Sequence, residues 1–188
     1  MPGISGPVTM TVRGGQPAVL RPLAPADREI YLACLEHVGP ESRRRRFLGP
    51  KHVLSEHEIR YFTEVDHHEH EALVAVIGGS VVAVARFVRD RQDRGLADWA
   101  IVVVDEWQGH GVGTALLRRL TERASEEGIE RLRGTMLHDN TGMFATIRRL
   151  GLPWRTVSSS SGVAEVELRP APRAVVPPAV RGPLGLVA

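Results

Sequence analysis

Cysteine is nearly absent from this chain, which has 188 residues and a single cysteine, Cys34. One cysteine cannot form a disulfide within the chain, so no covalent cross-link is available to stabilise the fold. Cys34 falls in an apolar series with Ile30, Leu35 and Val38. This helical spacing predicts a buried thiol in a helix core rather than a reactive nucleophile.

Long hydrophobic runs are also missing. No stretch approaches the roughly 18 apolar residues that a membrane-spanning helix requires, and the N-terminus has no charged segment followed by an apolar one. We therefore expect a cytoplasmic protein. Hydrophobic residues make up 43% of the sequence, which is enough to bury one core and leaves little room for a second.

The chain has no strong excess of one charge, because its formal net charge is +2. This balance does not indicate a nucleic-acid partner. The basic cluster from Arg43 to Arg46 has no interleaved aromatic residues. We expect a solvated helix face or ion pairs there, while binding of an acidic substrate or of a cofactor phosphate stays open.

Composition divides the chain into three parts. Residues 1–16 show no hydrophobic periodicity, and we expect a flexible arm. Residues 170–188 contain five prolines, a density that no helix or central strand tolerates, so a disordered tail is predicted. Residues 17–169 then form a single α/β domain.

Hydrophobic periodicity gives the expected elements of that domain. Strands are expected near residues 17–22, 71–78, 80–90, 96–104, 130–137, 153–158 and 163–169, and helices near 25–38, 55–64, 115–127 and 141–150. Gly78 and Gly79 predict a tight hairpin turn. This order of strands and helices indicates a mixed sheet flanked by helices.

A glycine-rich segment, Gln108 to Thr114, lies between an apolar strand and an amphipathic helix. The backbone N–H groups of such a turn point at one spot and the helix N-terminus adds partial positive charge, which predicts a phosphate site. A P-loop is excluded because no lysine follows the last glycine. A dinucleotide fingerprint is excluded because Thr114 stands where its third glycine should be.

The spacing that does fit is Gln/Arg-x-x-Gly-x-Gly/Ala, formed by Gln108, Gly111 and Gly113. Downstream, Asn140 precedes a helix that ends in a Leu-Gly-Leu turn at residues 150–152. Both motifs resemble the GNAT superfamily of N-acetyltransferases, and the resemblance covers about residues 18–169. Upstream segments look like its bacterial protein-lysine acetyltransferase branch, among them Arg21-Pro22-Leu23, Glu41-Ser42-Arg43 and Asp66-His67-His68.

The resemblance implies a GNAT-type sheet in which the two parallel strands near 96–104 and 130–137 splay apart. Acetyl-CoA would lie in that gap, paired with strand backbone, while the glycine loop holds its pyrophosphate. The cofactor-binding residues implied in this way are Ile101, Val102, Val103, Gln108, Gly109, His110, Gly111, Val112, Gly113, Thr114 and Asn140. Asn140 could equally cap the helix that follows it.

Attack on a thioester requires a neutral amine, so a lysine with a pKa near ~10.4 must lose its proton. Asp98 is the expected base, because Ala97 and Asp98 resemble an Ala-Glu pair found just upstream of the loop in protein-lysine members. The alternative for Asp98 is an ordinary solvated charge at the start of a strand. Glu106 and then Glu71 are the next candidates.

Two further positions bear on the chemistry. Many family members carry a tyrosine that protonates the departing CoA thiolate, but this chain has Ile147 at that offset. We therefore expect solvent to supply that proton. The cluster from Asp66 to Glu71 contains three histidines, but no third ligand from another segment is visible, so we expect no metal.

The predicted function is transfer of an acetyl group from acetyl-CoA to a primary amine, with a protein lysine as the preferred acceptor, by direct attack in a ternary complex. Two alternatives stay open. One is a small-molecule amine N-acetyltransferase, and the other is a non-catalytic module that senses acyl-CoA or docks a partner. We expect neither nucleic acid nor membrane as a partner, and the oligomeric state is unknown.

Overall fold

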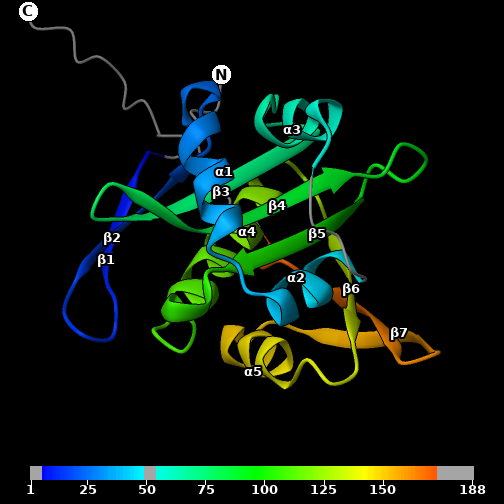
Figure 1. The fold of residues 1–188 in the computed structure, drawn as a ribbon. Coiled ribbons are helices and arrows are strands. Elements are labelled where there is room, and N and C mark those ends of the chain that lie inside the picture. Colours follow the sequence, from blue (N-terminus) through cyan, green and yellow to red (C-terminus); the bar gives the residue numbers. More distant parts are fainter. Residues whose placement is uncertain (1–5, 49–53, 173–188) are drawn as a thin grey trace, which may run out of the picture.

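The computed structural model describes residues 6–48 and 54–172. Its strands form a mixed sheet in the order β1-β2-β3-β4-β5-β6-β8-β7, in which β5 and β6 are the parallel pair (Figure 1). This arrangement confirms the predicted α/β fold class. The strands are β1 (Val8–Thr11), β2 (Pro17–Pro22), β3 (His70–Ile77), β4 (Ser80–Arg89), β5 (Leu96–Val103), β6 (Arg131–Leu137), β7 (Trp154–Ser160) and β8 (Val163–Leu168).

Helices cover both faces of the sheet (Figure 1). One face packs against α1 and α3 through a core cluster that includes Leu23, Tyr31 and Cys34, so the predicted burial of the thiol is confirmed. The other face packs against α4 and α5 through Leu116 and Ile147. The helices are α1 (Arg28–Glu36), α2 (Pro40–Phe47), α3 (Glu56–Thr63), α4 (Val112–Glu126) and α5 (Thr141–Leu150), with short 3-10 turns η1 (Pro25–Asp27) and η2 (Asp105–Trp107).

The central hairpin of β3 and β4 follows directly from its sequence. Both strands are buried along most of their length because helices cover both faces of the sheet, and this explains their near-continuous apolar runs. Gly78 and Gly79 have φ of 58° and 84°. Both angles suit the two-residue turn that joins twisted antiparallel strands, so the predicted hairpin is confirmed.

The helix α4 begins at Val112, three residues earlier than the amphipathic pattern predicts. Gly113 weakens the intrinsic helix propensity of the first turn. Val112 is nevertheless fully buried in the core, and this packing stabilises the extra turn. No helix in the described part of the chain combines the length and apolar character needed to cross a membrane.

The expectation of a flexible arm over residues 1–16 is wrong for Val8–Thr11, which form β1 and pair antiparallel with β2. Gly14 and Gly15, with φ of 106° and 87°, reverse the chain between these strands. A strand of four residues is too short to show a clear alternation. Residues 1–5 and 173–188 lie outside the described residues, so most of the predicted tail does too; residues 170–172 have no regular structure.

Hydrophobic periodicity does not predict the helix α2, although a solvated helix face was one of the two expectations for its arginine cluster. Its sequence is rich in arginine and has no apolar stripe, so hydrophobic periodicity gives no signal. The signals that could have shown it are Pro40 at the first helical position and Glu41 in the first turn. This helix proves to be the part of the fold that closes one side of the site.

The parallel strands β5 and β6 share only a short ladder. Their register runs from Leu96 opposite Arg131 to Asp98 opposite Arg133. Beyond Asp98, β5 continues to Val103 alongside β4, while β6 continues to Leu137 alongside β8. The two strands therefore diverge, and this confirms the predicted splay.

Candidate active site

The divergence of β5 and β6 opens a cleft of about 540 Å³. Ile101 lines it from the sheet face under α4, whereas Val102 lines it from the face under α1. The cleft therefore passes through the sheet, so that molecules from opposite faces can meet in it. Its lining comes from α2, β5, the glycine loop with the start of α4, β6 and α5: Ser42, Arg45, Arg46, Trp99, Ala100, Ile101, Val102, Val103, Trp107, Gln108, Gly109, Gly111, Gly113, Thr114, Gly134, Thr135, Met136, Asn140, Thr141, Gly142, Met143, Ala145, Thr146 and Arg149.

The glycine loop leads from the end of β5 into α4. Gly109 and Gly111 have φ of 76° and 89°, a left-handed conformation that side chains with a Cβ rarely adopt. A Cβ on Gly113 would lie 3.3 Å from Cγ2 of Val103, so the loop packs tightly on β5. Gly111 is the N-cap of α4, and the first N–H groups of a helix have no partner within it. This wall of the cleft suits a phosphate.

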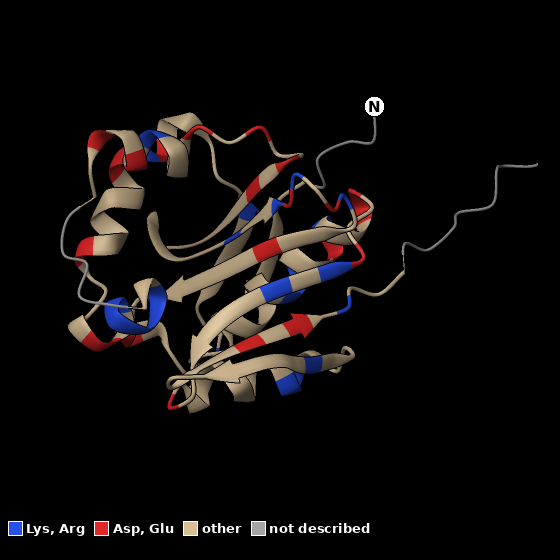
Figure 2. Cartoon of the chain, turned by 90° about the vertical axis from the view of Figure 1, so that its right-hand side faces the viewer, with Lys and Arg blue, Asp and Glu red and all other residues tan. Residues whose placement is uncertain are grey.

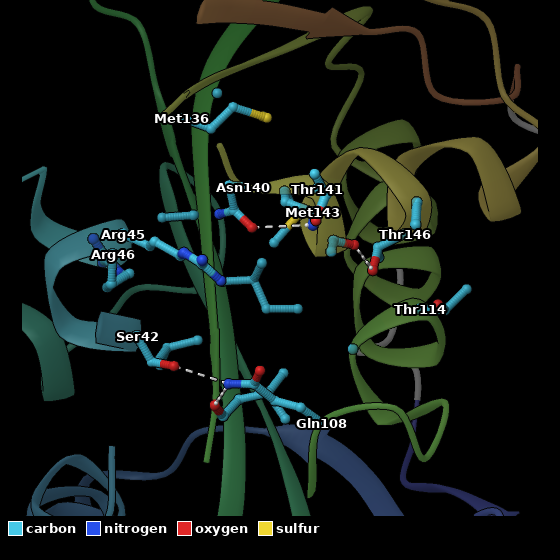
Figure 3. A pocket seen from close by; sticks show the side chains of 18 of the residues that line it. Ser42, Arg45, Arg46, Gln108, Thr114, Met136, Asn140, Thr141, Met143 and Thr146 are labelled. Atoms are coloured by element: carbon cyan, nitrogen blue, oxygen red, sulfur yellow. Dashed lines mark hydrogen bonds between the residues drawn. The ribbon is translucent and has the colours of Figure 1, made fainter. Parts of the chain in front are cut away.

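Gln108 was expected to bind the cofactor, and the structure also gives it contacts within the protein. It lines the cleft, but its Nε2 donates to Ser42 Oγ at 2.9 Å, to the Val103 carbonyl at 3.1 Å and to Asp105 Oδ1 at 3.1 Å. Figure 3 shows the contact with Ser42 crossing the lower part of the cleft. The amide therefore ties the loop to β5 and α2 and shapes the cleft from within.

Two other predicted cofactor-binding residues do not line the cleft. The Val112 side chain is fully buried in the core. The His110 ring lies 5.7 Å from the Trp107 ring, centroid to centroid, and its Nδ1 contacts the Gln108 carbonyl at 2.9 Å. Neither residue lines the cleft, so their contact with the cofactor stays a prediction.

Trp99 and Gly134 face each other across the diverging strands. A Cβ on Gly134 would lie 2.6 Å from the Trp99 ring, so glycine makes room for the indole. Trp99 is 7% exposed and its Nε1 has no hydrogen-bond partner in the described structure. A buried donor without an acceptor costs about 1–3 kcal/mol. This unpaired N–H lies against Gly134, and both residues belong to the lining of the cleft.

These features fit acetyl-CoA. A helix N-terminus with a glycine loop suits its pyrophosphate. The edge of β5 that does not pair with β6 suits an extended arm that contains amide groups. The residues present can therefore hold this group.

Asp98 lies at the last pair that β5 and β6 share. Side chains alternate along a strand, so Asp98 points to the same face as Ala100 and Val102, which is the face of α1 and, in Figure 1, of α2. Its carboxylate is exposed, and its Oδ1 accepts from Arg133 Nε at 2.9 Å. Asp98 does not line the cleft itself but directly precedes the first lining residue of β5, Trp99.

The other two candidate bases lie elsewhere. Glu106 is exposed in η2 and is not among the lining residues. Glu71 is fully buried: its Oε2 accepts from Arg123 Nε at 3.0 Å, and its Oε1 lies 2.6 Å from His67 Nδ1. Glu71 thus joins β3 to α4 as a structural ion pair. Among the described residues, no group of three or more His, Cys, Asp or Glu side chains could hold a metal ion.

Asn140 lines the cleft, and its side chain also caps α5, because Oδ1 accepts from the backbone N–H of Met143 at 3.1 Å (Figure 3). The cap explains the asparagine without a ligand. Ile147 is fully buried in the core and does not line the cleft. Residue 147 therefore provides no phenol, and it does not open onto the cleft.

Sequence reasoning missed one side of the site. Ser42, Arg45 and Arg46 of α2 lie along the cleft opposite Thr114 of α4 (Figure 3). The basic cluster was recognised, but its position was not. Nothing in the local pattern shows that a helix near residue 40 packs beside strands that begin at Leu96 and Arg131.

The chain resembles known acetyltransferases over most of its length. Residues 30–152 match the Acetyltransferase (GNAT) family. It is similar to Acetyltransferase Pat of Mycolicibacterium smegmatis, with 35% identity over 176 residues that cover 91% of this chain and 51% of that protein. The chain thus spans about half the length of this relative.

Solved structures give the same result. The GNAT domain of S. lividans PAT matches with a TM-score of 0.80 and 30% identity, covering 87% of this chain and 96% of that one. A cAMP-binding acyltransferase from Mycobacterium smegmatis matches with a TM-score of 0.61 and 31% identity, covering 91% of this chain and 49% of that one. The family match, the splayed strands and the glycine loop agree, and the chain belongs to the GNAT family of acetyltransferases.

Proposed function

We propose that this chain transfers the acetyl group of acetyl-CoA to the side-chain amine of a protein lysine. The observation that carries the proposal is the cleft through the sheet, with the glycine loop on one side and α2 on the other. Donor and acceptor can approach from opposite faces and meet between β5 and β6. A structure of the same fold, yncA from Salmonella typhimurium (19% identity, TM-score 0.63), contains its cofactor acetyl-CoA.

Acetyl-CoA would supply the activated acyl group. The loop from Gly109 to Thr114 would hold its pyrophosphate, and the edge of β5 would orient its amide-containing arm. Asp98 sits where the cleft begins, on the face of α2, and would accept the proton of the amine through a water molecule. Arg133, which bonds Oδ1, would keep this carboxylate in place.

The experiment is an acetylation assay on the purified chain. A lysine-containing protein incubated with acetyl-CoA and the chain should gain acetyl groups, seen as increments of mass on lysine side chains. Acetylation of small amines but not of protein would indicate a small-molecule enzyme. Binding of acetyl-CoA with no transfer to either acceptor would indicate a non-catalytic module and would refute the proposal.

A further inference from the structure

Two arginines of the α2 side lie close together beside the cleft. Arg46 comes from the last turn of α2 and lines the cleft. Arg86 comes from β4 and is 5% exposed. The register of β4 and β5 places Arg86 opposite Ala100, which also lines the cleft. Arg43 to Arg46 give the second half of α2 a continuous basic stretch, drawn in blue in Figure 2.

The partners of Arg86 are all neutral. Its Nη1 donates to the Phe62 carbonyl at 3.3 Å and contacts His70 Nε2 at 3.2 Å, and its Nη2 lies 3.4 Å from the Tyr31 hydroxyl. Burial and the positive charge of Arg86 lower the pKa of His70 to about 4, so this imidazole is neutral. The Arg86 charge is solvated by dipoles and rings but is not balanced by an anion.

Arg46 also lacks an acidic partner. Its guanidinium lies over the Phe47 ring at 5.0 Å, and no Asp or Glu of the described residues forms an ion pair with it. Its neighbours on α2 differ, because Arg44 and Arg45 both pair with Glu41 at 2.8 Å. The segments outside the described residues contain no Asp or Glu at all. Among the described residues, no acidic side chain therefore neutralises Arg46 or Arg86.

This imbalance has an energetic consequence. A charge removed from water is costly unless an opposite charge and hydrogen bonds replace the water. Burial and the neighbouring charge of Arg86 lower the pKa of Arg46 to about 10, which reflects that cost. An anion in the cleft beside Arg46 would relieve it.

The position of the pair identifies which reactant carries the anion. The phosphates of the donor fit the loop at the start of α4, whereas Arg46 lies across the cleft on α2. Ala100, opposite Arg86, is two residues from Asp98 on the same face of β5. An acceptor whose amine reaches Asp98 must therefore pass close to these arginines.

We propose that Arg46, with Arg86 behind it, binds a carboxylate of the acceptor, so that the preferred substrate is a lysine with an Asp or Glu side chain next to it in the chain. This inference rests on the proposed acetyl transfer. The subsite makes the enzyme selective among lysines, because a neutral neighbour leaves both arginines without a counter-charge.

Two peptides of equal length test it, one with Glu beside the target lysine and one with Gln at the same place. We would measure kcat/KM for each peptide and KM for acetyl-CoA. In the wild type, kcat/KM should be roughly tenfold or more higher for the Glu peptide, because a charge-assisted hydrogen bond contributes about that factor. R46Q should lose this preference and R46K should keep part of it, with the KM for acetyl-CoA unchanged.

The matched control is R60Q, which removes an equal charge from an exposed position of α3 and should keep the preference. Equal kcat/KM for both peptides in wild type would overturn the subsite and leave acetyl transfer intact. A raised KM for acetyl-CoA in R46Q with an unchanged peptide preference would assign Arg46 to the donor phosphates and overturn it as well. Failure of the wild type to acetylate any lysine would refute the proposed function itself, and this inference with it.

Discussion

At the scale of single residues, the site depends on where β5 and β6 stop pairing. Asp98 belongs to the last shared pair, and its ion pair with Arg133 links the two strands just before they diverge. Exposed ion pairs contribute only about 0–1 kcal/mol to stability. Replacing Asp98 therefore tests the chemistry of the site with little effect on the fold.

We expect Asp98→Asn to lower kcat by roughly 10²-fold or more, because a general base contributes about that factor. Affinity for acetyl-CoA should stay nearly unchanged, since the pyrophosphate loop and the β5 edge are intact. Steady-state kinetics and a binding titration measure the two effects. Glu106→Gln is the comparison, and it should keep wild-type kcat; full activity of Asp98→Asn from pH 6 to 9 would show that the base lies elsewhere.

A second residue-scale prediction concerns Gly134, which faces the Trp99 indole. Gly134→Ala places a methyl group 2.6 Å from the Trp99 ring, so the indole or the strand must move. Overpacking of this kind typically costs about 1–3 kcal/mol, and we expect a corresponding fall in the free energy of unfolding measured with urea.

The control for this substitution is Gly142→Ala at the start of α5, where a Cβ meets nothing within 4 Å. It should be neutral or slightly stabilising, because alanine is the better helix former. If both alanine variants unfold with the wild-type free energy, the contact between Trp99 and Gly134 does not constrain the cleft.

At the scale of elements, α4 connects the core to the ligand site. Leu116, Leu117 and Leu120 are fully buried on its sheet-facing side, which fixes the helix axis. As a consequence, the N-terminal end of α4 lies at the cleft. Glycines with positive φ flank both ends of the helix, Gly111 with 89° and Gly128 with 75°, and they allow a test that separates ligand binding from stability.

We expect Gly111→Val to abolish the stabilisation by acetyl-CoA, because the side chain intrudes where loop backbone and pyrophosphate meet. The strained backbone should also lower the melting temperature without ligand. Melting curves with and without acetyl-CoA measure both effects.

Gly128→Val introduces the same strain at the far end of α4, where a Cβ also meets nothing within 4 Å. It should lower the melting temperature but keep the full thermal shift with acetyl-CoA. An equal thermal shift in the Gly111 and Gly128 variants would show that the loop does not bind the cofactor.

At the scale of the whole molecule, two histidines near the start of β3 connect the sheet to both helical layers. His67 bonds to Glu71, and this bond raises the pKa of His67. The resulting stability is present at low pH and is lost as pH rises through the folded-state pKa. His70 behaves in the opposite way, since burial and Arg86 lower its pKa to about 4.

We expect the contribution of His70 to stability to fall as pH drops from about 6.5 toward 4. In this range the imidazole binds a proton in the unfolded chain but stays neutral in the folded protein. The loss should be of the order of 1–3 kcal/mol. Urea unfolding of wild type and His70→Gln at several pH values measures it, and the variant should show a flatter dependence in this window. His57→Gln, at an exposed position, should leave the wild-type slope unchanged; the same slope in His70→Gln would contradict the assignment.

Most of the fold was predictable from the sequence because its signals are local. Examples are the apolar runs of β3 and β4, the glycines of their turn and the apolar stripe of α4. Each of these signals depends only on residues within one segment. The spacing of Gln108, Gly111 and Gly113 identified the family for the same reason. The short strand β1 and the arginine-rich helix α2 were missed because neither carries enough periodic apolar residues to give a signal.

By itself, the sequence determined which elements form, where the loop lies and which chemistry the loop suits. The tertiary structure alone decided what meets at the cleft: it brought Arg46 beside Arg86, set Ser42 against Gln108, and turned Glu71 into a buried partner of α4. These contacts join residues far apart in the chain, and no local pattern encodes them. They arise because packing both faces of a twisted sheet fixes where each helix ends, and the side chains at those ends then become neighbours.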